Sequence, residues 1–483
     1  MRGTSLWSLA SSEGKRVCVY DVPVTYPAAP VNGIMISGMD APRFNEKSIF
    51  PIGERRNIID ALPNFDISSS IDYRYLASRH PDPEGECIRQ LRAHLEVEID
   101  TIDYLMKRDD WDLLVAVFRS TDSFQHIFWD SAARMMAGAP APGDERRAEA
   151  IFGVYERIDQ ALGGSWEEWL EARDLLIMSD HGFGELKSDI CLNRFLAQAG
   201  LLTFLPRRSG GGAQQFITGK LRDRFPTTSR KRLKKVLGRD DSDRRWQIFV
   251  DSFVSDIDFS RTRIFSIAQF GCFYVNLKGR RPLGVIEGES QRRAVVAEAR
   301  GALAGLVDPD DGKPVATRFY DREELYDGPL LDEMPDLVVE LRDYSYQGIY
   351  KTSEELAQAR IICGPPHQFG RLSFTGTHRR EGILILSGPS VRRARLPAAS
   401  MVDIAPTIAN IMGLPAIPEW DGRVLAEALI SGSAPGGTEG GGRRPDKMEE
   451  AAAAGSRQST RGAGYSEEDE EEVRRRLQDL GYI

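Results

Sequence analysis

The sequence has few cysteines, and they are widely separated. Its 483 residues include five, an odd number, and no two of them form a C-x-x-C pair. This usage favours reduced thiols over a disulfide framework. The first 17 residues, MRGTSLWSLASSEGKRV, also lack the apolar run of a signal peptide. We therefore expect a cytoplasmic protein.

Several other features are missing. No stretch approaches the ~18 apolar residues that a membrane helix needs, so we expect no transmembrane segment. No G-x-G-x-x-G follows an early strand, which argues against a dehydrogenase. The formal net charge is −9, from 63 basic and 72 acidic residues, and it argues against the whole molecule being a specific nucleic-acid binder.

The rest of the composition is that of a globular protein, with 41% hydrophobic and 28% charged residues. Short apolar segments alternate with longer amphipathic stretches. Strands are expected at Arg16–Tyr20, Gly33–Ser37, Asp112–Phe118, Asp174–Ser179, Asp336–Leu341 and Gly382–Ser387. Helices are expected over 84–107, 145–163, 289–306 and 400–412, the last opening with a capping box from Ser400 to Asp403. The alternation predicts an α/β fold with a mostly parallel sheet flanked by helices.

The chain is expected to divide into five parts. Residues 1–199 and 346–430 form the α/β core, and residues 200–345 form an inserted cap. Within the cap, residues 207–239 hold eleven Lys or Arg against one acid, which indicates either a solvated loop or an anion-attracting face. Residues 431–464 resemble a flexible linker. Residues 465–483 are expected to form a helix whose apolar stripe docks on the core or on a second copy in a homo-oligomer.

Three groups of polar residues lie beside predicted strands. Asp122 and His126 follow the strand DLLVAVF, Asp180 and His181 follow DLLIM, and His378 precedes GILILS. The carboxyl ends of parallel strands are where open α/β sheets place their ligands. Asp122 and His126 are four residues apart, so one helical turn brings them to the same side. A single Asp-His pair is usually a turn or a cap, but three such groups in one chain favour a shared site.

Carboxylates and imidazoles together form a mixed oxygen and nitrogen donor set. Such a set suits zinc, with manganese or iron as alternatives. His367, in the segment GPPHQFG, precedes His378 by eleven residues and is a candidate for lining the substrate site. His94 lies in a predicted helix and is expected at its surface or boundary.

The order of these motifs resembles a known family. The segments are LLVAVFRSTDSFQHIFWD, LLIMSDHGFG, EMPDLVVEL, GTHRREGILILSGP and DIAPTIANIMGLPAIPEWDGR, with DFSRTRIFSIAQFGCFYVNLKGR between the second and third. Together they resemble the type I phosphodiesterase and nucleotide pyrophosphatase branch of the alkaline phosphatase superfamily, over roughly residues 5–425. The resemblance depends on their order, because a DHG tripeptide alone is a weak signal.

The resemblance implies a metal-dependent phosphoester hydrolase with two divalent ions. Asp122, His126 and His378 would hold one ion, and Asp180 and His181 the other. The expected substrate is a small phosphoester, either a nucleotide or a lipid-like molecule. In the family, an N-terminal Asp and a Thr or Ser nucleophile complete the second site. The hydroxyl of that nucleophile forms a covalent phospho-enzyme, which water then hydrolyses.

The nucleophile is not identifiable in this sequence. The chain starts in a segment that resembles one following the nucleophile in the family, so the N-terminal segment is expected to be missing. Asp40 and Thr25 could be mistaken for the lost Asp and Thr, but their order is reversed. A catalytically inactive metal-binding pseudoenzyme is therefore an alternative. A sulfatase or phosphomutase of the same superfamily is another, although no sulfatase sequence C/S-x-P-x-R is present.

Overall fold

The computed structural model divides the chain into two compact units. One runs to Glu185 and resumes at Gln368, and the other covers Leu186–His367. The structure describes residues 3–67, 71, 73–205, 256–267, 271–280, 283–349, 361–362, 368–369 and 372–430. The predicted insertion, 200–345, falls within the second unit. Four features noted in the sequence lie outside the described residues: the basic segment 207–239, His367, the predicted linker 431–464 and the predicted helix 465–483. No helix among the described residues is long and apolar enough to cross a membrane.

The first unit is built on a four-stranded sheet of order β3-β2-β1-β4. Its strands are β1 (Val17–Val22), β2 (Gly33–Ser37), β3 (Ile49–Phe50) and β4 (Leu113–Ala116). β1 pairs in parallel with β2 and β4, and β3 is antiparallel to β2. Apolar side chains on both faces of β1 are buried, as expected for the centre of a covered sheet. β4 lies at the end of this order, with β1 as its partner among the described strands.

Two antiparallel ribbons extend the first unit. Their strands are β5 (Leu175–Met178) with β16 (Leu384–Ser387), and β6 (Gly182–Glu185) with β15 (Gly376–Arg379). A third pair joins β13 (Gln368–Phe369) to β14 (Leu372–Ser373). These pairings bring the segment near residue 180 beside the segment near residue 380, about 200 positions further along the chain.

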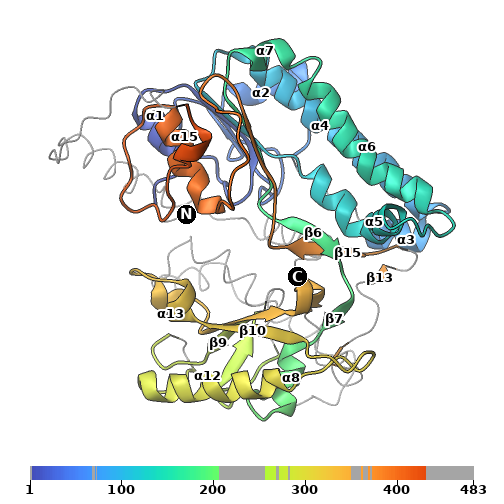
Figure 1. Cartoon of the computed structure of the whole chain (residues 1–483), viewed down its shortest axis with the longest axis vertical. Coiled ribbons are helices and arrows are strands. Elements are labelled where there is room, and N and C mark those ends of the chain that lie inside the picture. Colours follow the sequence, from blue (N-terminus) through green and yellow to red (C-terminus); the bar gives the residue numbers. More distant parts are fainter. Residues whose placement is uncertain are drawn as a thin grey trace, which may run out of the picture. The chain divides into compact units, whose positions relative to one another are not determined.

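Helices surround these strands. They are α1 (Leu6–Ser12), α2 (Glu54–Ala61), α3 (Tyr73–Arg79), α4 (Pro83–Arg108), α5 (Ser120–Met136), α6 (Asp144–Leu162), α7 (Glu167–Glu171) and α15 (Ile404–Ile411), with short turns η4 (Met401–Asp403) and η5 (Ala426–Ala428). Asp82 caps α4 by accepting from the Gly85 N–H, and Pro83 occupies its first position. α4 and α6 run side by side in Figure 1, joined by ion pairs such as Arg157 with Glu96.

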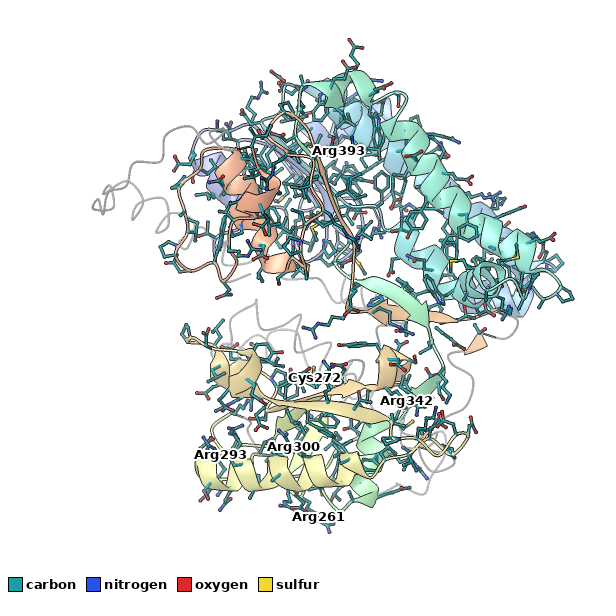
Figure 2. The ribbon with its side chains drawn as sticks, in the orientation of Figure 1. Arg261, Cys272, Arg293, Arg300, Arg342 and Arg393 are labelled. Atoms are coloured by element: carbon teal, nitrogen blue, oxygen red, sulfur yellow. The ribbon has the colours of Figure 1, made fainter. Side chains whose placement is uncertain are left out.

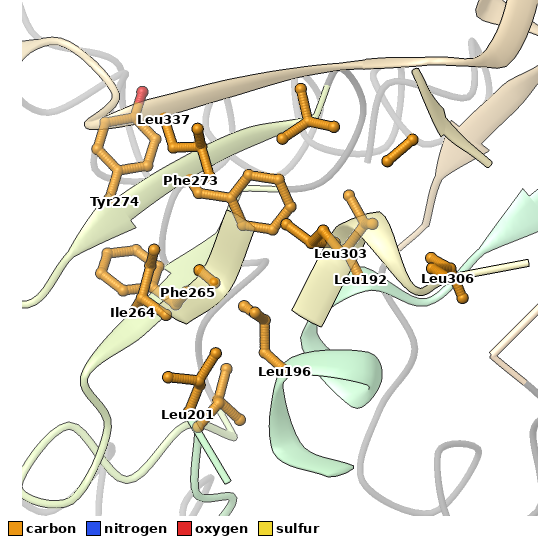
Figure 3. Close-up of a cluster of buried hydrophobic side chains, with 14 of the residues drawn as sticks. Leu192, Leu196, Leu201, Ile264, Phe265, Phe273, Tyr274, Leu303, Leu306 and Leu337 are labelled. Atoms are coloured by element: carbon orange, nitrogen blue, oxygen red, sulfur yellow. The ribbon is translucent and has the colours of Figure 1, made fainter. Parts of the chain in front are cut away.

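The second unit packs helices against an antiparallel sheet of order β10-β11-β9-β8. Its elements are β7 (Ser188–Ile190), α8 (Leu192–Gln198), β8 (Ile264–Ser266), β9 (Cys272–Val275), α12 (Gly288–Ala304), β10 (Ala316–Asp321), α13 (Arg322–Leu325), η2 (Leu331–Glu333), β11 (Leu337–Leu341), η3 (Arg342–Tyr344) and β12 (Tyr346–Gly348). Figure 3 shows its core, where Phe265 and Phe273 of the sheet lie near Leu303 of α12 and Leu196 of α8. These side chains are almost fully buried.

Charged side chains cover the outer face of this unit. Arg293 and Arg300, which Figure 2 shows on α12, pair with Glu289 and Asp321. Such exposed pairs add little stability because water screens them. Asp336 differs, since it is fully buried and accepts hydrogen bonds from the Val275 N–H and the Arg280 side chain. It therefore links the start of β11 to β9.

The prediction of an α/β fold is confirmed, with sheets that are only partly parallel. All six predicted strands and all four predicted helices are present, as is the capping box from Ser400 to Asp403. Parallel pairing among the described strands is limited to β2-β1-β4 and β7 with β12. β5, β16 and β11 are antiparallel, which corrects the expectation of a mostly parallel sheet. The alternating burial of β11 fits an antiparallel strand with one covered face.

Candidate metal centre

α5 presents two of the candidate ligands. It begins at Ser120, only a few residues after β4 ends at Ala116. Asp122 therefore lies in its first turn and His126 one turn later, on the same face. An acidic residue in the first turn is also favoured by the helix dipole. The helix runs to Met136, well beyond the single turn that is needed to bring Asp122 and His126 to one side.

A backbone carbonyl fixes the orientation of His126. The imidazole Nδ1 lies 2.9 Å from the Gly376 carbonyl oxygen and donates a hydrogen bond to it, since a carbonyl can only accept. The Nε2 atom is thereby left with its lone pair for a ligand. It lies 3.5 Å from Asp122 Oδ1 and 3.2 Å from His378 Nε2. Metal-binding histidines in proteins are commonly held in this way.

Gly376 allows β15 to approach α5 closely. A Cβ at this position would lie 2.3 Å from the Gln125 carbonyl oxygen and 2.7 Å from Trp129 Cβ. Any other residue would therefore force the strand away from the helix. The first residue of the Gly-Thr-His motif has a steric reason to be glycine, and the third, His378, extends toward α5 as a result.

Thr375 forms further hydrogen bonds between the segment before β15 and α5. Its Oγ1 donates to the Ile127 carbonyl oxygen, at 3.0 Å, and accepts from the Asp130 N–H, at 3.2 Å. Its backbone N–H donates to the His126 carbonyl oxygen, at 2.7 Å. Three hydrogen bonds thus attach the chain before β15 directly to the backbone of α5.

His181 joins this group from the turn between β5 and β6. Its Nδ1 lies 3.2 Å from the Gly182 carbonyl oxygen, and its Nε2 lies 3.8 Å from Asp122 Oδ1 and 3.5 Å from Asp180 Oδ1. A Cβ at Gly182 would lie 2.0 Å from the Glu381 carbonyl oxygen, so the glycine of the Asp-His-Gly sequence permits the close approach of the two segments. The Asp180 side chain is 70% exposed.

The spacing of the ligand atoms fits tetrahedral coordination. Zinc–nitrogen bonds of about 2.05 Å place the ligand atoms of a tetrahedron roughly 3.3 Å apart. Asp122 Oδ1, His126 Nε2 and His378 Nε2 are separated by 3.2, 3.2 and 3.5 Å. A second, overlapping group has the ligand atoms of Asp122, His181 and His378 within 4.8 Å of one another. The residues present therefore fit a zinc-like ion in both chemistry and spacing.

The electrostatics of the cluster suit ligand binding. Burial alone would raise the pKa of Asp122, but the neighbouring His126 and the hydrogen bond from His378 outweigh it and lower the pKa to about 2. Burial lowers the pKa of His126, despite the opposing effect of Asp122. The carboxylate is thus ionised and the His126 imidazole neutral near pH 7, the forms that bind metal ions.

Aromatic side chains surround the imidazoles, and the sequence motifs do not predict them. The Phe183 ring lies 4.9 Å from the His126 ring and 5.3 Å from that of His378. Phe374 lies 5.3 Å from the His126 ring on another side. A signal for Phe183 was present, because it directly follows the Asp-His-Gly sequence. Nothing in the sequence marked Phe374, whose place depends on the pairing of β15 with β6.

Thr25 and Asp40 serve the loop that contains them. Thr25 is buried, and its Oγ1 donates to the Val22 carbonyl oxygen, at 2.6 Å, and accepts from the Gly38 N–H, at 3.0 Å. Asp40 Oδ2 accepts from the Tyr26 N–H, at 3.0 Å. Both side chains therefore hold the segment from 22 to 40 together.

Solved structures of two mammalian proteins resemble this chain weakly. Human ectonucleotide pyrophosphatase / phosphodiesterase 5 has 11% identity and a TM-score of 0.32, with 71% of this chain and 64% of the human protein covered. The murine protein has 12% identity and a TM-score of 0.34, with 86% and 72% covered. The chain thus spans less than two thirds of the human protein. At TM-scores this low, neither likeness bears on activity. No curated protein matches the sequence.

A family model gives the stronger result. Residues 1–360 match the family described as type I phosphodiesterase / nucleotide pyrophosphatase. The matched segment contains Asp122, His126, Asp180 and His181, while His378 follows it. Members of the family act on small phosphoester substrates and typically bind divalent metal ions. Because the match covers about three quarters of the chain, the protein belongs to the type I phosphodiesterase / nucleotide pyrophosphatase family.

Proposed function

We propose that this chain is a metal-dependent phosphoester hydrolase that cleaves a phosphodiester or pyrophosphate bond in a nucleotide or lipid-like molecule. One observation carries the proposal. The ligand atoms of Asp122, His126 and His378 lie 3.2–3.5 Å apart, although His378 is more than 250 residues from the other two. Tertiary contacts between β15 and α5 create this arrangement, and it matches the donor set of a zinc site.

The proposed centre holds two divalent ions, zinc first, with manganese or iron as alternatives. Asp122, His126 and His378 would hold one, and Asp180 with His181 the other. Bound ions supply positive charge that polarises a phosphoryl oxygen and stabilises the leaving oxygen. The exposed carboxylate of Asp180 supports a second position open to substrate.

The protein's own residues orient the ligands and shape the site. The Gly376 carbonyl oxygen holds His126, and the Gly182 carbonyl oxygen holds His181. The rings of Phe183 and Phe374 cover the His126 imidazole and limit its contact with water. A dry surrounding strengthens electrostatic interactions with a phosphate group. The residue that attacks phosphorus stays unassigned.

A catalytically inactive metal-binding protein is the second candidate. The observation that favours it is the use of the Thr25 hydroxyl in two hydrogen bonds within its own loop. In that case the family's covalent route is closed to Thr25, and any hydrolysis by water alone is expected to be slow. A sulfatase or phosphomutase has no comparable support.

Location and assembly also stay proposals. The five widely spaced cysteines support a cytoplasmic location. Cys18 and Cys87 are buried, and burial raises the pKa of both thiols, that of Cys87 to about 12. A homo-oligomer through residues 465–483 is a prediction that concerns residues outside the described part of the chain.

The test is hydrolysis of a chromogenic phosphodiester by the purified 483-residue chain loaded with zinc. His378→Ala removes a proposed ligand, and His80→Ala, on the loop before α4, is the matched control. Turnover that is lost in His378→Ala and kept in His80→Ala would support a hydrolase. Zinc binding without turnover in the unmodified chain would contradict it and favour the inactive metal-binding protein.

A further inference from the structure

A buried carboxyl group lies under the first turn of α5. Glu98, on α4, is fully buried, and its Oε1 accepts hydrogen bonds from the backbone N–H groups of Arg119, at 2.9 Å, and Ser120, at 3.3 Å. The first N–H groups of any helix lack partners within it. Arg119 occupies the N-cap position of α5 but makes no capping bond with its own side chain. Glu98 therefore caps α5 from a neighbouring helix.

The same turn is attached to β1 through a side chain. Arg119 Nε donates to Asp21 Oδ2, at 2.5 Å, and its Nη2 donates to the Ile67 carbonyl oxygen, at 3.3 Å. Asp21 is fully buried near the end of β1, where the register with β2 shifts, and has a φ of 59°. Few non-glycine residues adopt this conformation, although Asp does so more readily than most. The start of α5 is thus fixed on two sides, by α4 and by β1.

The buried charges around Glu98 balance one another while its own carboxyl group is neutral. The Arg119 guanidinium pairs with Asp21, so one buried cation already meets one buried anion. Burial raises the pKa of Glu98 to about 8, and burial together with Arg119 lowers the pKa of nearby His94 to about 3. A neutral carboxyl group still offers a carbonyl oxygen to the two N–H groups. Glu98 therefore interacts with α5 through the geometry of its hydrogen bonds and not through charge.

We propose that Glu98 is a positioning residue for the metal centre, because it fixes the first turn of α5 and so aims Asp122 and His126. Asp122 lies only three residues after Arg119, within the turn that Glu98 caps. The far side of the same region is held by the bonds of Thr375 and Gly376 to α5. The ligand atoms of Asp122, His126 and His378 stay 3.2–3.5 Å apart only if both ends of this turn are held in place. This inference rests on the proposed metal centre.

The test is the zinc affinity of the full chain, measured by competition with a chromogenic chelator. Glu98→Ala removes the acceptor, and Glu98→Asp withdraws it by one methylene. Both are expected to weaken zinc binding roughly tenfold or more, as groups that support metal ligands do. Glu98→Gln keeps an acceptor oxygen at the same place and is expected to bind zinc as the unmodified chain does. If Glu98→Ala does not fold, the contrast between Asp and Gln carries the test.

The matched control is Asp403→Asn. Asp403 is also a buried carboxyl group at a helix start, and it accepts from the Ser400 and Arg423 N–H groups, away from α5. The Asp403→Asn substitution should lower the stability of the chain without changing its zinc affinity. The absorption spectrum of bound Co²⁺ provides a second measurement, because it reports ligand geometry. It should change in Glu98→Asp and not in Glu98→Gln.

The outcomes separate this inference from the proposed hydrolase. Unchanged zinc affinity in Glu98→Ala or Glu98→Asp would overturn the positioning role. Equal weakening in Glu98→Gln and Glu98→Ala would also overturn it, because the acceptor oxygen would then not be the cause. An unmodified chain that binds no zinc would overturn both this role and the metal centre. Lack of phosphodiester turnover would count against the hydrolase alone, since zinc affinity does not depend on it.

Discussion

The imidazole ring of His181 lies flat against that of His378, with ring centroids 3.5 Å apart and planes 18° apart. His378 belongs with Asp122 and His126 in the proposed first ion site, whereas His181 belongs with Asp180 in the second. The two proposed sites therefore meet at this stack. The geometry also allows a rival arrangement, in which Asp122, His181 and His378 share one ion.

The first prediction distinguishes these arrangements by zinc content. With two sites, the unmodified chain should bind two zinc ions, and His181→Ala and His126→Ala should each bind one, because each loses a ligand of a different ion. Elemental analysis of the dialysed proteins measures this. A single zinc per unmodified chain, lost in His181→Ala, would point instead to the shared arrangement.

The second prediction concerns the approach of β15 to α5. Gly376→Ala would place a Cβ 2.3 Å from the Gln125 carbonyl oxygen. We expect a loss of stability of about 1–3 kcal/mol, as for other overpacked sites, and weaker zinc binding because His378 moves with its strand. Chemical unfolding and chelator competition measure the two effects.

Gly153→Ala is the control for that substitution. Gly153 lies within α6, and an added Cβ there would meet nothing within 4 Å. Alanine should stabilise the helix by about 0.5–1 kcal/mol and leave zinc binding unchanged. Equal stability of Gly376→Ala and the unmodified chain would show that the close contact can relax.

The third prediction is a pH dependence from Glu98. Its pKa in the folded chain, about 8, lies above its ordinary value of 4.5. Between these values the folded state holds a proton that the unfolded state has released, so the free energy of unfolding falls as pH rises. The groups around it are Asp21, Arg119, His94 and Tyr20, and the last two are neutral in this range.

Urea unfolding of the zinc-free chain at a series of pH values measures how the free energy of unfolding depends on pH. Glu98→Gln cannot titrate, so its stability should fall less than that of the unmodified chain between pH 4.5 and 8. The stability of the two proteins should differ most at the upper end of the range. Parallel pH profiles would mean that Glu98 is ionised in the folded chain.

The fourth prediction concerns Thr25. Thr25→Val removes the hydroxyl that bonds the Val22 carbonyl oxygen and the Gly38 N–H, and should cost roughly 1–3 kcal/mol, because buried partners are left unsatisfied. Zinc affinity and any phosphodiester turnover should stay as in the unmodified chain. Loss of turnover with zinc still bound would identify Thr25 as a nucleophile after all.

The sequence predicted element positions better than their pairing. Apolar runs such as that of β5 mark a strand by composition alone, but nothing in it specifies β16 as an antiparallel partner. Polar residues that flank apolar strands mark the candidate ligands in the sequence: Asp122, His126, Asp180, His181 and His378. The structure brings their ligand atoms together. Whether they bind metal stays a prediction.

Other parts of the site depend on contacts that no local pattern encodes. Glu98 follows the ordinary spacing of a charged amphipathic helix, and only the packing of α4 against the start of α5 buries its carboxyl group. Phe374 is likewise an ordinary loop residue until β15 pairs with β6. Such residues could be found only by knowing which elements are neighbours.

The contact between β15 and α5 also determines when the candidate site can assemble during synthesis. The bond from His126 to Gly376 spans 250 residues, and His378 comes two residues later. During synthesis, a ribosome must therefore reach residue 378 before the proposed first ion site has all three ligands. Nascent chains that end before His378 hold only Asp122 and His126 of these three ligands, and two ligands bind a metal ion weakly. We therefore expect tight metal binding at the proposed first ion site only after His378 has been synthesised.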